Sequence, residues 1–82
     1  MNNSEVMTLN NVPIGGRCYL NNIVNIDTDR IKRLYDLGFV NNAEIKVLFK
    51  SMSNNAVAYK IRGSVIALRD NDAKKIIVSL RR

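Results

Sequence analysis

One stretch of the chain, Asp29 to Phe39, limits the fold more than any other, because a helix start, an apolar face and a helix stop follow one another in it. Asp27 and Thr28 stand at its start, and a short side-chain oxygen at either position can accept a hydrogen bond from the first free amides of a helix. Apolar residues then recur three and four positions apart and so share one side of a helix: Ile31, Leu34, Tyr35 and Leu37. We therefore predict one main helix over about residues 29–37.

The end and the polar side of this helix are also indicated. Gly38 suits the left-handed conformation that commonly follows a helix, and Phe39 can fold back on Leu34 as the apolar contact of that stop. Opposite charges stand four residues apart on the polar side in two pairs: Asp29 with Arg33, and Lys32 with Asp36. We expect a basic, ion-paired face toward solvent.

Short segments on both sides of the helix alternate apolar and polar residues, as strands with one buried face do. A slip of this alternation at Asn21-Asn22 predicts a bulge, and residues 8–13 and 70–75 suit short helical turns. The strands are predicted over residues 17–26, 44–50, 57–61, 65–69 and 76–80. The fold class that follows is mainly β (α+β), a small, partly closed antiparallel β-barrel of about five strands with one main helix.

The core of this barrel is expected to come from the apolar phase of the strands. Ile45, Val47 and Phe49 share one face of their segment, and Tyr59 lies in the apolar phase of the next one. Cys18 is interpreted as a small apolar core residue, because the chain has no histidine that could act as its base. We predict that all five side chains are buried.

The composition predicts one small cytosolic domain. The chain has 82 residues, of which 46% are hydrophobic and 24% charged, so it has room for a single core and little surplus stability. We expect a flexible tail over residues 1–7, the barrel domain over 8–80 and a basic tail over 81–82. No apolar run approaches the roughly 20 residues of a membrane span, no signal peptide is recognisable, and the single cysteine suits the cytosol.

Residues that commonly perform chemistry are scarce. With no histidine and one cysteine, the chain has no ligand set for zinc or for an iron–sulfur cluster. The acids at the predicted helix starts are explained by capping: Asp27, Asp29, Asp70 and Asp72. We therefore predict no catalytic residues, no tightly bound metal and no cofactor, and a protein that is not an enzyme.

The formal net charge of +6 favours an acidic partner, which could be nucleic acid, an anionic membrane surface or an acidic protein face. The cations are spread from Arg17 to Arg82, however, and a spread charge can also serve solubility alone. Exposed aromatic rings for base stacking are too few to favour nucleic acid over protein.

Four stretches of the chain resemble, in this order, the ferrous iron transport protein A (FeoA) family. They are similar to that family's opening turn before a glycine pair, its helix end, its arginine-glycine turn with the strand that follows, and its closing alanine-x-x-isoleucine-x-valine. The four are Thr8–Gly16, Arg33–Phe39, Ile61–Arg69 and Ala73–Val78, within the span 8–80. The chain departs from the family at Asn41-Asn42, where proline-glycine is usual, and at Met52–Ala56, which replaces a proline-containing loop.

This resemblance implies an SH3-like barrel in the bacterial cytosol that works beside FeoB, a membrane iron permease with a GTPase domain. It implies an accessory or regulatory protein that binds the cytosolic part of FeoB, meets the inner face of the membrane through this partner, and does not carry iron itself. Weak self-association is compatible with this role. Whether the effect on FeoB is activating or inhibitory is left open.

The residues predicted to bind the partner are the helix cations Arg30, Lys32 and Arg33, with Tyr35 and Met52 as apolar anchors. Cations can steer association with an acidic partner, while a buried aromatic anchor supplies most of the binding energy. Two plainer interpretations are that Arg33 only pairs with Asp29 and that Tyr35 belongs to the core. An arginine that acts in trans on the GTPase is a further alternative.

Two other classes of function are kept as alternatives. A small basic barrel that binds RNA or DNA would lose affinity steeply with added salt, whereas a docking face with an apolar anchor would not. A sensor of an anion or a metal would depend on the carboxylates alone.

Overall fold

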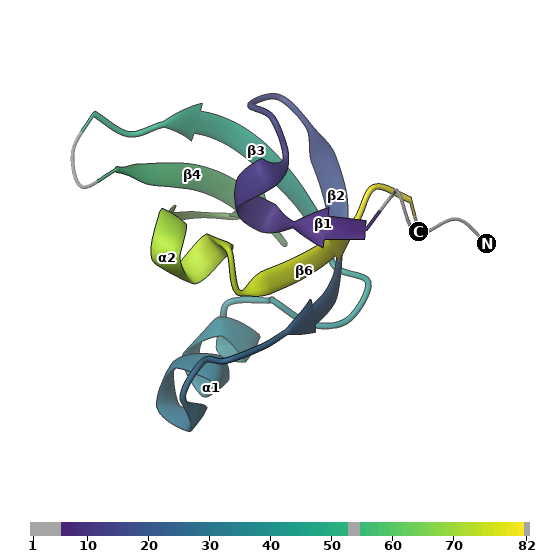
Figure 1. Ribbon diagram of the computed structural model, residues 1–82, viewed down its shortest axis with the longest axis vertical. Coiled ribbons are helices and arrows are strands. Elements are labelled where there is room, and N and C mark those ends of the chain that lie inside the picture. Colours follow the sequence, from purple (N-terminus) through teal and green to yellow (C-terminus); the bar gives the residue numbers. More distant parts are fainter. Residues whose placement is uncertain (1–5, 53–54, 82) are drawn as a thin grey trace.

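The computed structural model describes residues 6–52 and 55–81 of the chain, and Figure 1 shows the arrangement of its elements. In chain order they are β1 (Val6–Thr8), the 3₁₀ turn η2 (Leu9–Asn11), β2 (Arg17–Ile23), α1 (Thr28–Asp36), β3 (Glu44–Lys50), β4 (Ala56–Ile61), β5 (Ser64–Arg69), α2 (Asp70–Ala73) and β6 (Ile76–Ser79). Within the described residues, no helix is long and apolar enough to span a membrane.

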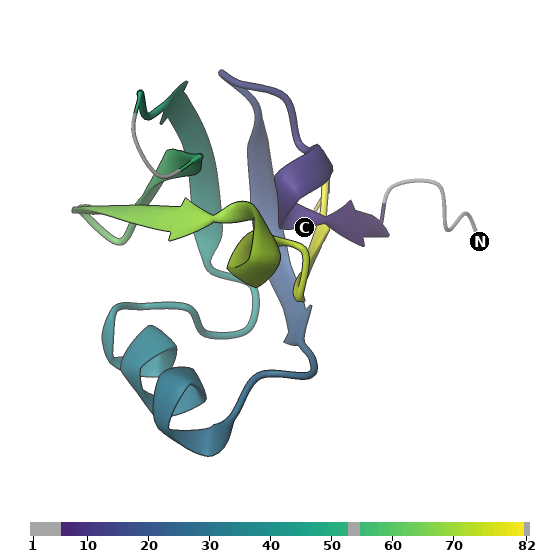
Figure 2. The ribbon, with the colours of Figure 1, turned by 60° about the vertical axis from the view of Figure 1, so that its left-hand side comes forward.

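The strands form one antiparallel sheet in the order β1-β6-β2-β3-β4-β5, which curls on itself (Figures 1 and 2). In the described part of the chain β1 and β5 are the two edges, and η2 and α2, which follow them, contact each other. Asn10 Nδ2 in η2 donates to Asp70 Oδ1 in α2 over 3.0 Å. The predicted mainly β, partly closed antiparallel barrel is confirmed, with six strands in place of about five.

The additional strand is β1, which pairs with β6 through Val6 opposite Ser79 and Thr8 opposite Ile77. The tail predicted over residues 1–7 is wrong for Val6 and Met7, which belong to the sheet, and residues 1–5 lie outside the described residues. Three residues are too few to show an alternating pattern, so the sequence could not indicate this strand.

A single apolar core fills the barrel. Its largest fully buried side chains are Tyr59, Phe39, Leu9, Ile45, Ile61, Ile76, Val78 and Cys18. The predicted burial of Cys18 is confirmed, and its thiol donates to the carbonyl oxygen of Ile45 over 3.7 Å. Burial raises the pKa of this thiol to about 12, so Cys18 stays protonated at neutral pH and is a packing residue, with no thiolate to react.

In the described residues the sheet contains two register shifts, of which one was predicted. The shift in β2 between Leu20 and Asn22 confirms the bulge expected from the slipped alternation. The second lies in β3, where Val47 pairs with Tyr59 but Phe49 pairs with Ala58. The prediction that Phe49 is buried is therefore wrong: the extra residue reverses the facing of the strand and leaves the Phe49 side chain 55% exposed.

The main helix α1 forms as predicted, displaced by one residue toward the N-terminus. The side chain of Asp27 accepts from the amide of Arg30 over 3.0 Å and caps the start. At the other end, Gly38 donates to the carbonyl of Tyr35 and Phe39 to that of Leu34, both over 3.0 Å. This pair of hydrogen bonds defines a glycine-terminated helix stop, with Phe39 buried in the core.

A candidate protein-docking site between helix and edge strand

The apolar side of α1 is only partly covered by the barrel. Of the helix residues Thr28–Asp36, only Leu34 is buried. The side chain of Tyr35 is 51% exposed, and that of Leu37, just past the helix, 37%. Figures 1 and 2 show α1 standing below the sheet. The alternative in which Tyr35 belongs to the core is therefore wrong.

The end of α1 is fixed to the barrel through Gly38. Its backbone has φ +111°, and a Cβ at this position would lie 2.7 Å from Cδ of Arg62. Arg62 sits in the two-residue turn between β4 and β5, itself with φ +49°. The helix stop thus packs against that turn, which brings α1 alongside β5.

A groove of about 240 Å³, named here the α1–β5 groove, lies between these two elements. Leu34 and Leu37 contribute apolar surface from the helix side, and consecutive residues 66–68 line it from β5. Arg30 and Arg33 also line it. An apolar groove bordered by cations is suited to hold part of an acidic protein.

The ion pair found at the groove differs from the ion pairs predicted on the helix. Arg30 Nη2 pairs with Asp72 Oδ2 in α2, a contact between elements that no local spacing indicates. In the described residues neither of the predicted pairs four apart on α1 forms an ion pair. An exposed ion pair on a helix gains little free energy compared with two hydrated charges, so the absence of these pairs is not unusual. Within residues 6–52 and 55–81, Lys32 and Arg33 therefore take part in no ion pair.

The five residues predicted to bind a partner do not form one surface. Arg30 and Arg33 line the α1–β5 groove, while Lys32 and Tyr35 are exposed on α1 without lining it. Met52 is fully exposed two residues past the end of β3 and does not line the groove. Sequence reasoning missed the β5 wall and Asp72, both of which only the folded chain brings to the helix.

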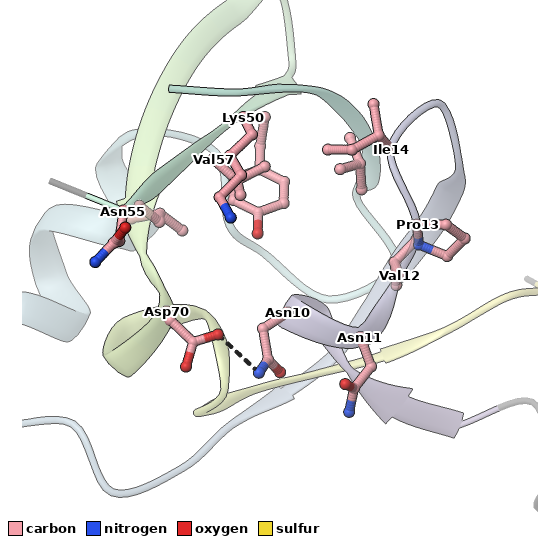
Figure 3. Close-up of a pocket in the computed structure, with 12 residues that line it drawn as sticks. Asn10, Asn11, Val12, Pro13, Ile14, Lys50, Asn55, Val57 and Asp70 are labelled. Carbon is pink, nitrogen blue, oxygen red and sulfur yellow. Dashed lines mark hydrogen bonds between the residues drawn. The ribbon is translucent and has the colours of Figure 1, made fainter. Parts of the chain in front are cut away.

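A second hollow, of about 560 Å³, lies between the η2–β2 loop and the β3–β4 hairpin. Figure 3 shows Lys50, Asn55 and Asp70 around it, with the hydrogen bond from Asn10 to Asp70 on one side. Tyr59 lines it with a ring that is only 1% exposed. Burial, with a smaller effect of Cys18 and Asp70, raises the pKa of its hydroxyl to about 12, which keeps it protonated.

A metal centre finds no support among the described residues. In residues 6–52 and 55–81, no three His, Cys, Asp or Glu side chains gather closely enough to hold an ion. The candidate site is the α1–β5 groove, whose apolar and cationic lining suits binding.

Comparison with known proteins now adds to this geometry. The family model of the FeoA domain matches residues 7–80, which is nearly the whole chain. The chain belongs to the FeoA family. This is a family of small proteins involved in ferrous iron transport and is not a known enzyme family.

Relatives of known structure or curated sequence agree with this assignment. The putative Fe(2+) transport protein A of Campylobacter jejuni is 31% identical over 74 residues, which is 90% of this chain and 99% of the relative. The solution structure of the Chlorobium tepidum FeoA protein is 26% identical and superposes with a TM-score of 0.84 over 93% of this chain and 71% of its own. The zinc-bound FeoA of Stenotrophomonas maltophilia, described as an SH3 domain protein, is 24% identical, with a TM-score of 0.75 over 89% of each chain. The SH3-like fold expected from the sequence is thereby confirmed.

Proposed function

We propose that this protein is an accessory or regulatory protein of ferrous iron uptake that binds the cytosolic, GTPase-bearing part of a FeoB-type permease through the α1–β5 groove. Family membership and the name of the Campylobacter relative support the link to iron. The binding role rests on one observation: α1 keeps an incompletely covered apolar side next to Arg33, which forms no ion pair within the described residues. The protein works in the cytosol and meets the membrane through its partner.

The apolar residues and the cations of this site are expected to contribute to binding in different ways. Exposed Leu37 and the half-buried Ile66 would lose water contact on docking, which supplies the holding energy. Arg33 would steer an acidic partner and fix its orientation. Arg30 contributes less, because Asp72 already neutralises it. The trans-acting arginine remains a separate hypothesis for the exposed Arg33.

Two charge reversals on the same chain test the proposal. Arg33→Glu places an acid in the groove, and Lys46→Glu makes the same change on β3, outside it. With the soluble cytosolic domain of the cognate permease in a calorimeter, we expect Arg33→Glu to weaken binding by about tenfold or more. Lys46→Glu should leave affinity nearly unchanged. Equal effects of the two variants, or no binding by the unmodified protein, would contradict the proposal.

One observation favours the nucleic-acid alternative. Four cations, Arg17, Lys46, Lys60 and Arg62, line a hollow of about 540 Å³, although Arg17 pairs with Glu44 at 3.1 Å. If this hollow binds phosphates, retention on single-stranded oligonucleotides should fall steeply with salt and should be lost in Lys46→Glu. The same variant therefore separates the two functions: it leaves permease binding intact and abolishes nucleic-acid binding.

A further inference from the structure

One wall of the groove is β5, which is an edge of the sheet in the described part of the chain. In the described residues β5 pairs only with β4. The turn between them has positive φ at both central residues, Arg62 (+49°) and Gly63 (+84°), the geometry of a tight two-residue hairpin. Ile61 and Ser64, which flank this turn, are therefore a hydrogen-bonded pair.

The alternation of an antiparallel ladder then fixes which groups of β5 face outward. Counting from Ser64, residues 66 and 68 exchange hydrogen bonds with β4, and Val65 and Ala67 direct their N–H and C=O groups away from it. Among the described residues no other backbone group bonds to Val65 or Ala67. Their peptide groups are consequently available to another chain.

This edge lacks the features of the strand itself that commonly protect an edge against pairing. Edge strands are commonly shortened, bulged, or interrupted by charge or proline. β5 has six residues and no register shift, and the stretch from Ser64 to Leu68 carries neither charge nor proline. Val65 is 60% exposed. The other edge, β1, has only three residues.

The α1–β5 groove follows the backbone of this edge. Successive side chains of a strand point to opposite faces, yet three consecutive residues, Ile66, Ala67 and Leu68, all line the groove. Such a lining is expected if the groove runs along the edge of β5, with α1 forming the opposite wall. A segment seated there would meet free peptide groups on one side and Leu37 and Arg33 on the other.

We infer that the groove receives an extended segment of the partner, which adds to β5 as a further strand and carries an acidic residue opposite Arg33. The inference rests on the proposed function and specifies its binding mode. Arg33 supplies the charge complementarity, because the one acid lining the groove, Asp72, is engaged by Arg30. A second copy of this chain is disfavoured as the occupant, because each copy has a net charge of +6.

Hydrogen exchange of single amides, measured by NMR on the intact protein with and without the soluble cytosolic domain of the permease, tests this mode. In the free protein the amides of Val65 and Ala67 should exchange fast, and those of Ile66 and Leu68 slowly. In the complex, Val65 and Ala67 should slow by about tenfold or more, while their two neighbours change little.

The outcomes separate the inference from the function on which it rests. Complex formation without slowing at Val65 and Ala67 overturns strand addition and leaves the proposed function standing. Slowing in the free protein that grows with its concentration identifies a second copy as the occupant and also overturns the inference. Absence of any complex overturns both.

A backbone variant gives an independent check. Ala67→Pro removes an N–H that points away from β4 and keeps the hydrogen bonds of the β4–β5 ladder. It should lower permease affinity by about tenfold or more, whereas the matched Ala67→Ser, which keeps the N–H, should bind like the unmodified protein. Equal binding by a folded Ala67→Pro overturns the inference, and the exchange experiment decides if this variant fails to fold.

Discussion

At the scale of single residues, Gly38 links the helix to the barrel. It ends α1 in a backbone conformation that L-residues rarely adopt, and the stem of Arg62 lies directly against it. Any side chain at position 38 would therefore strain the backbone and would also collide with Arg62 in the neighbouring turn. The placement of α1 beside β5, and with it the groove, depends on this position.

Gly38→Ala should therefore destabilise the fold by about 1–3 kcal/mol, because φ is +111° and the new Cβ would stand 2.7 Å from Cδ of Arg62. Urea denaturation measures the change. Combining it with Arg62→Ala separates the two causes, since the second substitution removes the closest atoms, Cδ and Cγ, and leaves the backbone strain. A loss below about 0.5 kcal/mol would contradict this account of the helix stop.

Burial of Cys18 and Tyr59 predicts sensitivity to alkali. The pKa values rise from 9.0 and 10.0 to about 12 in the folded protein, and the charged form is the deprotonated one. Their contribution to stability is thus complete below about pH 9 and is lost as pH rises toward 12, by up to ~1.4 kcal/mol per pH unit for each group.

Denaturation midpoints from pH 8 to 11 measure this dependence. Between pH 9 and 10 the decline belongs mainly to the thiol, so Cys18→Ala should flatten that part of the curve even though it lowers stability overall. A curve for the unmodified protein that stays level up to pH 11 would be inconsistent with both buried groups.

At the scale of elements, local signals were enough for α1 and insufficient for β3. The cap at Asp27, the apolar spacing and Gly38 are all contained within the helix and its ends, so the sequence indicates the helix without reference to the rest. In β3, Leu48 is apolar like its neighbours, and the pattern cannot reveal that it is the extra residue. The register there is set by pairing with β4, which is not a local property.

The cap gives a test at this scale. Asp27→Ala removes the acceptor for the Arg30 amide and should cost about 1 kcal/mol of unfolding free energy. Asp29→Ala is the matched control, because Asp29 forms no ion pair in the described residues and should change stability by less than about 0.5 kcal/mol. A larger cost for Asp29 than for Asp27 would show that the helix starts elsewhere.

The register shift of β3 gives a second test at the scale of elements. Phe49→Ser should change stability by less than about 1 kcal/mol, because the ring is largely exposed, whereas Val47→Ala should cost about 2 kcal/mol or more through the cavity it leaves. Both can be followed by thermal unfolding. A larger loss of stability for Phe49→Ser than for Val47→Ala would contradict the register shift. It would indicate that β3 alternates without a bulge and that Phe49 lies in the core.

At the scale of the whole molecule, the residues predicted from the sequence include two of the nine that line the α1–β5 groove, Arg30 and Arg33. The cations of α1 were found because they are neighbours on one helix. Local patterns do not reveal how far these cations lie from other elements, so Met52 was grouped with them although it does not line the groove, and Ile66 and Ala67 were missed. The family resemblance indicated the fold and implies the class of partner proposed above, and the folded chain was needed to find the groove.

The central claim is that the α1–β5 groove is where the permease docks. NMR chemical shifts of the protein, mapped as the permease's cytosolic domain is added, test it most directly. We expect the largest changes at Arg33, Leu37 and Ala67, with the hairpin tip at Met52 unaffected. Changes concentrated at Met52, or around Lys46 and Lys60, would contradict the claim.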